Sequence, residues 1–336
     1  MYRLFAALIA LPLLLLTACS RQHAESAQAE STAAAQSAET SELTPVSLQL
    51  NWFPETEHGG YYQALIKGYY REAGLDLTII KGGPNTPVEL QTATGRTTFG
   101  IVNADKILVA RSEAVPIVGL LAPFQTSPRC IIVHESSPVT KLEELKNCTL
   151  VANSTKPFVK YLQHRYGLEG VSIIPYKGGM AQFLADKTFA IQGYITSEPL
   201  TISSQGVANR PLLVADTGYN PYTSVLITSE KHASDSPELV RAMVQASQRG
   251  WLDYLKDPST ANAEIKKQNP EMSDEALTFG VAALPKLMQT DWTAEHGFGA
   301  MTVERWKELA VQLQECEVLP NTTVTVDTAF TNQFLK

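Results

Sequence analysis

The 336-residue sequence lacks the short motifs that define the common classes of enzyme. It has no Gly-x-Ser-x-Gly elbow, no Walker phosphate loop, no Gly-x-Gly-x-x-Gly turn after a strand and no His-Glu-x-x-His helix. Its six histidines are scattered without the spacing of metal ligands. We therefore expect no enzyme, no cofactor, no metal site and no catalytic residue.

Positive charge is also scarce. The chain has 27 Lys and Arg against 34 Asp and Glu, a formal net charge of −7, which argues against a nucleic-acid surface. Among the turns that follow the predicted strands, Lys156 and Lys177 stand apart from any basic cluster. A ligand with a sulfonate group, which needs several donors, is therefore disfavoured.

The one long apolar run lies near the start of the chain. Residues 4–16 are too short a run for a spanning helix, and residues 1–18 have the pattern of a secretory signal. The sequence Leu-Thr-Ala-Cys that ends at Cys19 resembles a bacterial lipobox, which implies that Cys19 is acylated and anchors the protein in a membrane. An ordinary signal with an unmodified Cys19 is the alternative. Residues 19–44 are rich in Ala, Ser, Gln and Glu and predict a disordered tether.

Only three further cysteines are present. Cys130 and Cys148 each begin an apolar strand, CIIVH and CTLVA, and an exported chain can form disulfides. Two alternatives stay open: a Cys130–Cys148 bridge, if the two strands are neighbours and start level, or two buried thiols. Cys316 is expected to be a small core residue.

Residues 47–80 predict a strand, a turn, a helix and a second strand. Leu48, Leu50 and Trp52 alternate with polar residues, as in a strand with one buried face. Gly59 opens the helical periodicity that follows. In such a βαβ unit the turn after the first strand faces the crevice where open α/β sheets bind ligands.

Strands and helices of about ten residues continue to alternate along the chain, which predicts mostly parallel sheets covered by helices on both faces. A second series of the same kind begins at Cys130 and includes a helix over Pro157–Tyr166. Two consecutive series predict an α/β protein with two lobes. After Ser236 the chain is mainly helical.

Several sequence blocks resemble the solute-binding proteins of ABC importers in the group related to thiamine-pyrimidine synthases. That group includes binders of pyrimidine precursors and of riboflavin, and it is similar to the alkanesulfonate and taurine binders. The resemblance covers nearly all of the chain after about Thr44, and it is carried by NWFPETEHGGYYQALIKGYYREAGLDLTII, GGPNTPVEL, FGIVNADKILVAR, LEELKNCTLVANS, GYITSEP and SPELVRAMVQASQRGWLDYL.

The resemblance implies a two-lobed periplasmic-binding-protein fold of type II with a two-strand hinge. Lobe 1 would comprise residues 45–125 and 222–336, and lobe 2 residues 126–221. The candidate crossings between the lobes, Pro123–Pro128 and Thr217–Thr223, are rich in Pro, Gly, Tyr and small polar residues, as in a hinge.

Aromatic residues at predicted turns and strand ends are the first candidates for ligand binding, because a planar ligand gains about 0.5–1.5 kcal/mol from stacking beyond burial. They are Trp52, Phe53, Tyr61, Tyr194 and Tyr222. Each is expected to reach the crevice.

Polar candidates follow the predicted strands: His58, Asn103, Asn153, Ser154 and Glu198. Helix capping explains Asn103 and Asn153 equally well, and His58 could cap the helix after it. The resemblance implies that Glu198 faces an aminopyrimidine ring, because an acidic residue lies in a similar place in pyrimidine-binding relatives.

The predicted function is capture of a small planar heterocycle and its delivery to an ABC permease and its ATPase. A thiamine pyrimidine precursor is the first candidate, riboflavin the second and an alkanesulfonate the third. The alternative from another class is a pyrimidine-synthesis enzyme that consumes His58. Such enzymes resemble one another in carrying cysteines in the region that corresponds to Val151–Phe158, and this segment has no cysteine. We expect a monomer in the cell envelope, facing the periplasm or the cell exterior.

Overall fold

The computed structural model describes residues 42–177, 179–320 and 326–336. The chain divides into Met1–Glu42 and Leu43–Lys336, and the description below concerns the second part. The predicted signal peptide, Cys19 and nearly all of the predicted tether lie outside the described residues.

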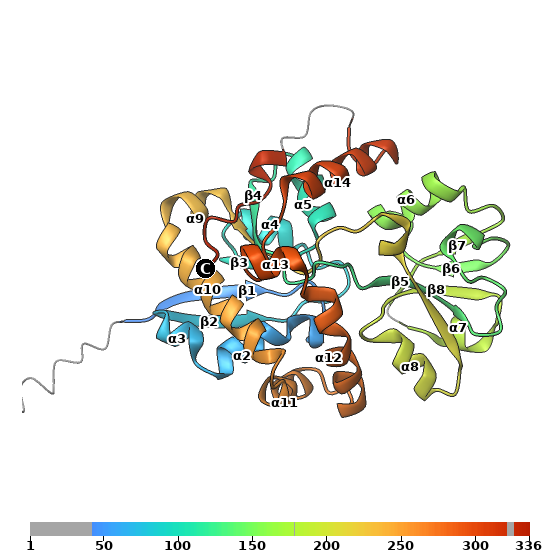
Figure 1. Cartoon of the computed structure of the whole chain (residues 1–336), viewed down its shortest axis with the longest axis horizontal. Coiled ribbons are helices and arrows are strands. Elements are labelled where there is room, and N and C mark those ends of the chain that lie inside the picture. Colours follow the sequence, from blue (N-terminus) through green and yellow to red (C-terminus); the bar gives the residue numbers. More distant parts are fainter. Residues whose placement is uncertain (1–41, 178, 321–325) are drawn as a thin grey trace, which may run out of the picture. The chain divides into compact units, whose positions relative to one another are not determined.

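The first sheet has the strand order β2-β1-β3-β10-β4 (Figure 1). Strand β1 pairs in parallel with β2 and β3, whereas β10 runs antiparallel to β3 and β4. The strands are β1 (Thr44–Gln49), β2 (Leu75–Ile80), β3 (Phe99–Val102), β4 (Ile117–Leu121) and β10 (Val225–Ser229).

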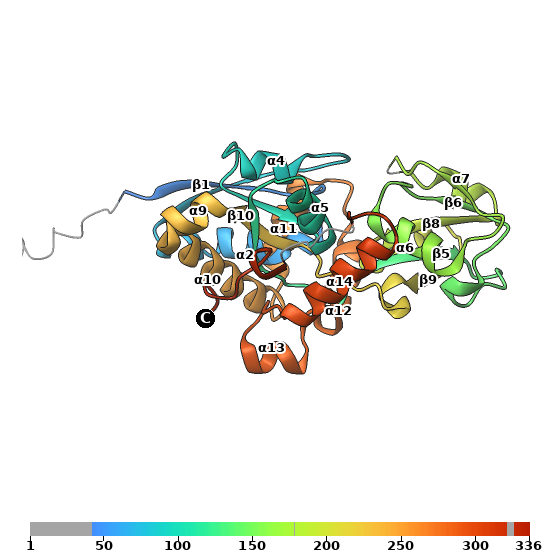
Figure 2. The ribbon, with the colours of Figure 1, turned by 90° about the horizontal axis from the view of Figure 1, so that it is seen from above.

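Helices cover both faces of this sheet (Figures 1 and 2). Phe99 and Ile101 belong to a core that includes α2, α10, α11 and α12, while Val102 and Ile117 belong to a second core that includes α4, α5 and α14. The helices are α2 (Gly59–Ile66), α3 (Tyr69–Glu72), α4 (Val88–Ala93), α5 (Ala104–Ser112), α9 (Glu230–Asp235), α10 (Pro237–Tyr254), α11 (Ser259–Gln268), α12 (Asp274–Met288), α13 (Asp291–His296) and α14 (Val303–Glu315), with 3₁₀ turns η1 (Thr56–His58) and η4 (Val326–Thr328).

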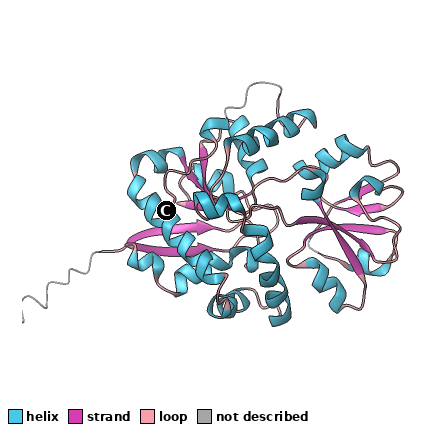
Figure 3. Cartoon of the chain, in the orientation of Figure 1, coloured by secondary structure: helices cyan, strands magenta, loops and turns pink. Residues whose placement is uncertain are grey.

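The second sheet has the order β7-β6-β8-β5-β9 and lies apart from the first (Figure 3). Strand β6 is parallel to β7 and β8, and β5 is antiparallel to β8 and β9. Its elements are β5 (Arg129–His134), β6 (Thr149–Val151), β7 (Ser172–Ile174), β8 (Phe189–Tyr194), β9 (Asn209–Leu213), α6 (Pro157–Tyr166), α7 (Ala181–Ala185), α8 (Glu198–Ser204), η2 (Leu142–Glu144) and η3 (Val214–Thr217).

Two segments connect the sheets: residues 122–128 after β4 and residues 218–224 before β10. They run side by side, because Phe124 and Thr223 form an antiparallel bridge and the Ser127 N–H donates to Asn220 Oδ1 at 2.8 Å. The predicted α/β fold with two lobes and a two-strand hinge is confirmed. The predicted lobe boundaries fall within these two segments.

Each sheet is mostly parallel, as predicted. One strand in each runs against the others: β10 and β5, which follow the two crossings, are antiparallel to both of their neighbours.

Of the two alternatives left open for Cys130 and Cys148, the structure has the free thiols. Cys130 is buried and Cys148 is partly buried. Their strands β5 and β6 are not neighbours, because β8 lies between them, so the two residues are not placed for a bridge.

Candidate functional site

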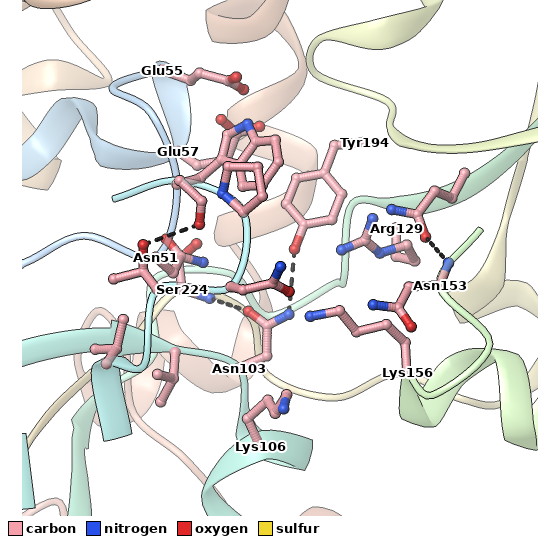
Figure 4. A pocket seen from close by; sticks show the side chains of 18 of the residues that line it. Asn51, Glu55, Glu57, Asn103, Lys106, Arg129, Asn153, Lys156, Tyr194 and Ser224 are labelled. Carbon is pink, nitrogen blue, oxygen red and sulfur yellow. Dashed lines mark hydrogen bonds between the residues drawn. The ribbon is translucent and has the colours of Figure 1, made fainter. Parts of the chain in front are cut away.

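A cavity of about 470 Å³ lies between the two lobes (Figure 4). Its walls come from the turns after β1, β2 and β3 in lobe 1 and after β6, β7 and β8 in lobe 2. These are the carboxyl ends of the parallel strands, where ligands bind in open α/β sheets. The lining residues are Asn51, Trp52, Glu55, Glu57, His58, Gly83, Pro84, Asn85, Thr86, Pro87, Val88, Glu89, Val102, Asn103, Lys106, Arg129, Asn153, Lys156, Tyr176, Gln192, Tyr194, Glu198 and Ser224.

The turn after β1 is packed tightly against the turn after β2. The Gly82 N–H donates to Trp52 O at 3.0 Å. A Cβ at Gly82 would lie 2.2 Å from Leu50 O and 2.6 Å from Trp52 N, so only glycine fits there. Trp52 lines the cavity and meets Phe53 edge to face, with ring centroids 5.5 Å apart.

His58 holds this turn in place from inside. Its Nδ1 accepts from the Glu55 N–H at 3.3 Å, so Nε2 carries the proton and donates to Asn51 Oδ1 at 3.0 Å. Burial lowers the pKa of His58 to about 3. The ring is therefore a neutral structural link at neutral pH. It links η1 to the preceding turn by hydrogen bonds. Its side chain makes no capping bond to α2, so the alternative that His58 caps this helix was wrong.

Four carboxyl groups line the cavity: Glu55, Glu57, Glu89 and Glu198. Burial raises the pKa of Glu55, Glu57 and Glu198, and the charge of Glu57 raises that of Glu55 further. Glu57 accepts from the Thr196 hydroxyl across the lobes.

Glu198 is the first residue of α8 rather than a strand end. Its Oε2 accepts from the Tyr194 N–H at 2.7 Å, and its Oε1 accepts from the Tyr176 hydroxyl at 3.5 Å. Both partners line the same cavity. The carboxyl group is thus held in a fixed position with capacity for further hydrogen bonds.

Three cations line the cavity as well: Lys106 on α5, Arg129 at the start of β5 and Lys156 just before α6. The Arg129 guanidinium lies over the Tyr194 ring, 4.2 Å from its centroid. Burial and then the charges of Lys106 and Arg129 lower the pKa of Lys156. The expectation that no basic cluster lies at these turns was wrong, because the three residues come from separate segments that only the fold brings together.

Asn103 and Asn153 serve different structural roles. The Asn103 amide nitrogen donates to the Tyr194 hydroxyl at 3.3 Å and its Oδ1 accepts from the Ser224 N–H at 3.2 Å, so the side chain links the lobes instead of capping α5. Asn153 Oδ1 accepts from the Thr155 N–H at 3.1 Å, which makes it a turn-forming residue. Both line the cavity.

Six of the ten predicted binding residues line the cavity: Trp52, His58, Asn103, Asn153, Tyr194 and Glu198. Contact of these six with a ligand stays a prediction.

The expected positions of the other four were wrong. Tyr61 is fully buried with its ring edge to face on Trp251, 5.5 Å between centroids, and Tyr222 is buried with its hydroxyl accepting from the Thr302 N–H at 2.9 Å. Phe53 and Ser154 are exposed and lie outside the lining.

Local sequence patterns gave no sign of several lining residues. Ser224 has a φ of +53°, and its buried hydroxyl has no hydrogen-bond partner among the described residues. Tyr176 and Gln192 also line the cavity. The rule that ligands bind at the carboxyl ends of strands could have found Tyr176, which follows β7, but Gln192 lies inside β8.

Residues 42–177, 179–320 and 326–336 contain no group of three or more His, Cys, Asp or Glu with an arrangement that could hold a metal ion. No helix in these residues is long and apolar enough to cross a membrane.

The fold is the two-lobed fold of periplasmic binding proteins. The aliphatic sulphonate binding protein SsuA of Escherichia coli has the same fold, with a TM-score of 0.65 and 11% identity over 87% of this chain and 94% of that one. The family described as NMT1/THI5 like matches residues 55–261, more than half of the sequence, and the chain belongs to this family.

Curated relatives match over most of their length. The riboflavin-binding protein RibY of Chloroflexus aurantiacus is 27% identical over 96% of this chain and 95% of its own. The formylaminopyrimidine-binding protein of Halalkalibacterium halodurans is 22% identical over 85% and 89%. A 4-amino-5-hydroxymethyl-2-methylpyrimidine phosphate synthase of Candida albicans is 23% identical over 69% and 74%.

Proposed function

We propose that this chain is the solute-binding component of an ABC importer and captures a small planar heterocycle between its lobes. The observation that carries the proposal is a cavity with Trp52 on one lobe and Tyr176 and Tyr194 on the other. Aromatic rings on both walls suit a planar ligand, since offset or edge contacts with a ring contribute about 0.5–1.5 kcal/mol beyond burial.

An aminopyrimidine precursor of thiamine is the first candidate ligand. Glu55, Glu57 and Glu198 place carboxyl groups in the cavity, where they can accept from amino groups and ring N–H groups. A hydrogen bond to a charged group contributes about 1.5–3 kcal/mol. Such bonds would orient a pyrimidine against Trp52.

Riboflavin is the second candidate. The cavity volume of about 470 Å³ is within the range of roughly 300–1,000 Å³ usual for pockets that hold a drug-sized ligand. The similarity to RibY over nearly the whole chain supports the same ligand class.

Lobe closure about residues 122–128 and 218–224 would convert binding into a signal for the permease. The interlobe bonds from Asn103 to Tyr194 and from Thr196 to Glu57 lie beside the cavity, so a ligand there can stabilise the closed state. Export and anchoring through an acylated Cys19 complete the proposal, and the protein would act as a monomer.

The enzymatic alternative needs a reactive histidine. His58 is almost fully buried, and both ring nitrogens are engaged by Asn51 and the Glu55 backbone. We therefore propose a binding protein. An intact His58 after incubation with iron and pyridoxal phosphate, measured by peptide mass spectrometry, supports this choice, and its conversion would contradict it.

The decisive experiment is mass spectrometry of small molecules released from the purified protein, followed by thermal unfolding with each candidate. A ligand at 100 times its dissociation constant should add about 2.7 kcal/mol to the free energy of unfolding. Failure of aminopyrimidines, riboflavin and alkanesulfonates alike would contradict the proposal.

Glu198→Gln should separate the candidates. The variant should weaken the binding of an aminopyrimidine at least tenfold and that of riboflavin little. The reason is that the substitution removes the charged acceptor for the amino group of the pyrimidine. Glu143→Gln, at an exposed position of lobe 2, is the matched control. Equal losses for both ligands in calorimetry would refute the role of Glu198.

A further inference from the structure

We infer that the captured heterocycle carries an anionic substituent, a phosphate or a carboxylate, which Lys106, Arg129 and Lys156 bind. Figure 4 shows these three side chains on the side of the cavity away from Glu55 and Glu57. The inference rests on the proposed function and adds the chemical class of the ligand to it.

The three cations converge from both lobes. Lys106 belongs to lobe 1, whereas Arg129 and Lys156 belong to lobe 2. All three line the main cavity and also a small adjoining hollow of about 50 Å³. An anion held among them would therefore bridge the lobes at the point where they close.

Carboxylates lie near this cluster without pairing with it, and the charges of Asp105 and Glu89 act on Lys156. Within the described parts of the chain, none of the three side chains forms an ion pair. The nearby Asp105 carboxylate accepts from the Tyr219 hydroxyl at 2.9 Å and from the backbone N–H of Lys106 at 2.8 Å, and not from the Lys106 ammonium group.

Arg129 is oriented but not satisfied. Its guanidinium lies 4.2 Å from the Tyr194 ring centroid and 5.1 Å from that of Phe158, so contacts with the ring faces hold it in place. A guanidinium has five N–H donors in its plane, and among the described residues the Arg129 side chain forms no ion pair that would occupy them. A fixed fork of donors facing a cavity matches the paired oxygens of a carboxylate or phosphate.

The electrostatics of Lys156 agrees with the geometry. Its pKa is lowered by burial and then by the charges of Lys106 and Arg129, and the charges of Asp105 and Glu89 offset part of this shift. An anion between the three cations would be attracted by all of them at once. A neutral ligand gains no such attraction.

The test compares each heterocycle with its phosphorylated form, riboflavin with flavin mononucleotide and 4-amino-5-hydroxymethyl-2-methylpyrimidine with its phosphate. Isothermal titration calorimetry should give a dissociation constant about tenfold or more lower for one of the phosphorylated forms or for a carboxylated analogue. This advantage should shrink as salt rises, because screening weakens charge interactions.

Lys156→Met should remove the advantage and leave the affinity for the neutral form within about twofold. The melting temperature of the ligand-free variant should stay equal or rise, since a repelling charge is removed; a lysine needed for packing would lower it. Lys160→Met, at an exposed position of α6 outside the lining, is the matched control and should change neither value.

Two results would overturn the inference: equal or tighter binding of the neutral forms, or equal effects of Lys156→Met and Lys160→Met. The proposed function can fail separately. If no heterocycle binds but inorganic phosphate raises the melting temperature of Lys160→Met and not of Lys156→Met, the anion site is supported and the heterocycle is refuted. If nothing binds, both are refuted.

Discussion

His58→Gln is expected to change how the stability of the protein depends on pH. The buried His58 ring is neutral, with its pKa lowered to about 3, against about 6.5 in an unfolded chain. Because the pKa of His58 is lower in the folded protein than in the unfolded chain, its contribution to stability is fully present above pH 6.5. That contribution is lost as pH falls from 6.5 towards 3, because the unfolded chain binds a proton that the folded protein excludes.

The magnitude follows from the two pKa values. Between pH 7 and pH 5 the proton uptake of unfolded His58 should lower the free energy of unfolding of the wild type by about 2 kcal/mol, at roughly 1.4 kcal/mol per pH unit below 6.5. Glutamine does not titrate, so the variant lacks this loss. At pH 7 the variant should itself be less stable by about 0.5–1.5 kcal/mol for each hydrogen bond that glutamine does not replace.

The assay is urea unfolding followed by tryptophan fluorescence at pH 7 and pH 5. The buried carboxyl groups of Glu57 and Glu198 act in the opposite direction, since their raised pKa values favour the folded state as pH falls. They are present in both proteins and cancel in the comparison. His164 is exposed, so the control variant His164→Gln measures how an exposed histidine contributes to the pH dependence of stability. A gap between wild type and His58→Gln that is the same at both pH values would refute the reasoning.

Two further predictions concern packing and thiols. Gly82→Ala should lower the free energy of unfolding by about 1–3 kcal/mol and weaken ligand binding, because its Cβ would lie 2.2 Å from the Leu50 carbonyl oxygen. The control Gly179→Ala should be tolerated, because a Cβ at Gly179 meets nothing within 4 Å. Equal melting temperatures for the two variants would contradict the steric account. A reducing agent should leave the melting temperature unchanged, because Cys130 and Cys148 are free thiols; a drop of several degrees would mean that they are bridged.

The fold was largely predictable because its signals are local. The helix Pro157–Tyr166 was predicted with its observed bounds, since proline favours the first turn and the apolar spacing has the helical period. Strands followed by helices predicted open sheets, and the ends of such strands correctly marked Asn103 and Asn153 as cavity residues.

The errors arose where a side chain's surroundings depend on a distant segment. Tyr61 has the same spacing whether it faces a ligand or α10, and only the packing of α10 on α2 directs it to Trp251. Arg129 looks like the polar first residue of a strand. It becomes a cavity residue because the neighbouring strand β8 carries Tyr194, over which it stacks.

Local sequence patterns are sufficient for the order of helices and strands, the two lobes and the positions of the turns that face the cleft, because hydrophobic period and turn chemistry act over a few residues. The pairing of strands is different. It placed β8 between Cys130 and Cys148, and it turned β10 and β5 antiparallel. The charge of the site also depended on long-range packing, because Lys106, Arg129 and Lys156 meet only when both lobes fold around one cavity.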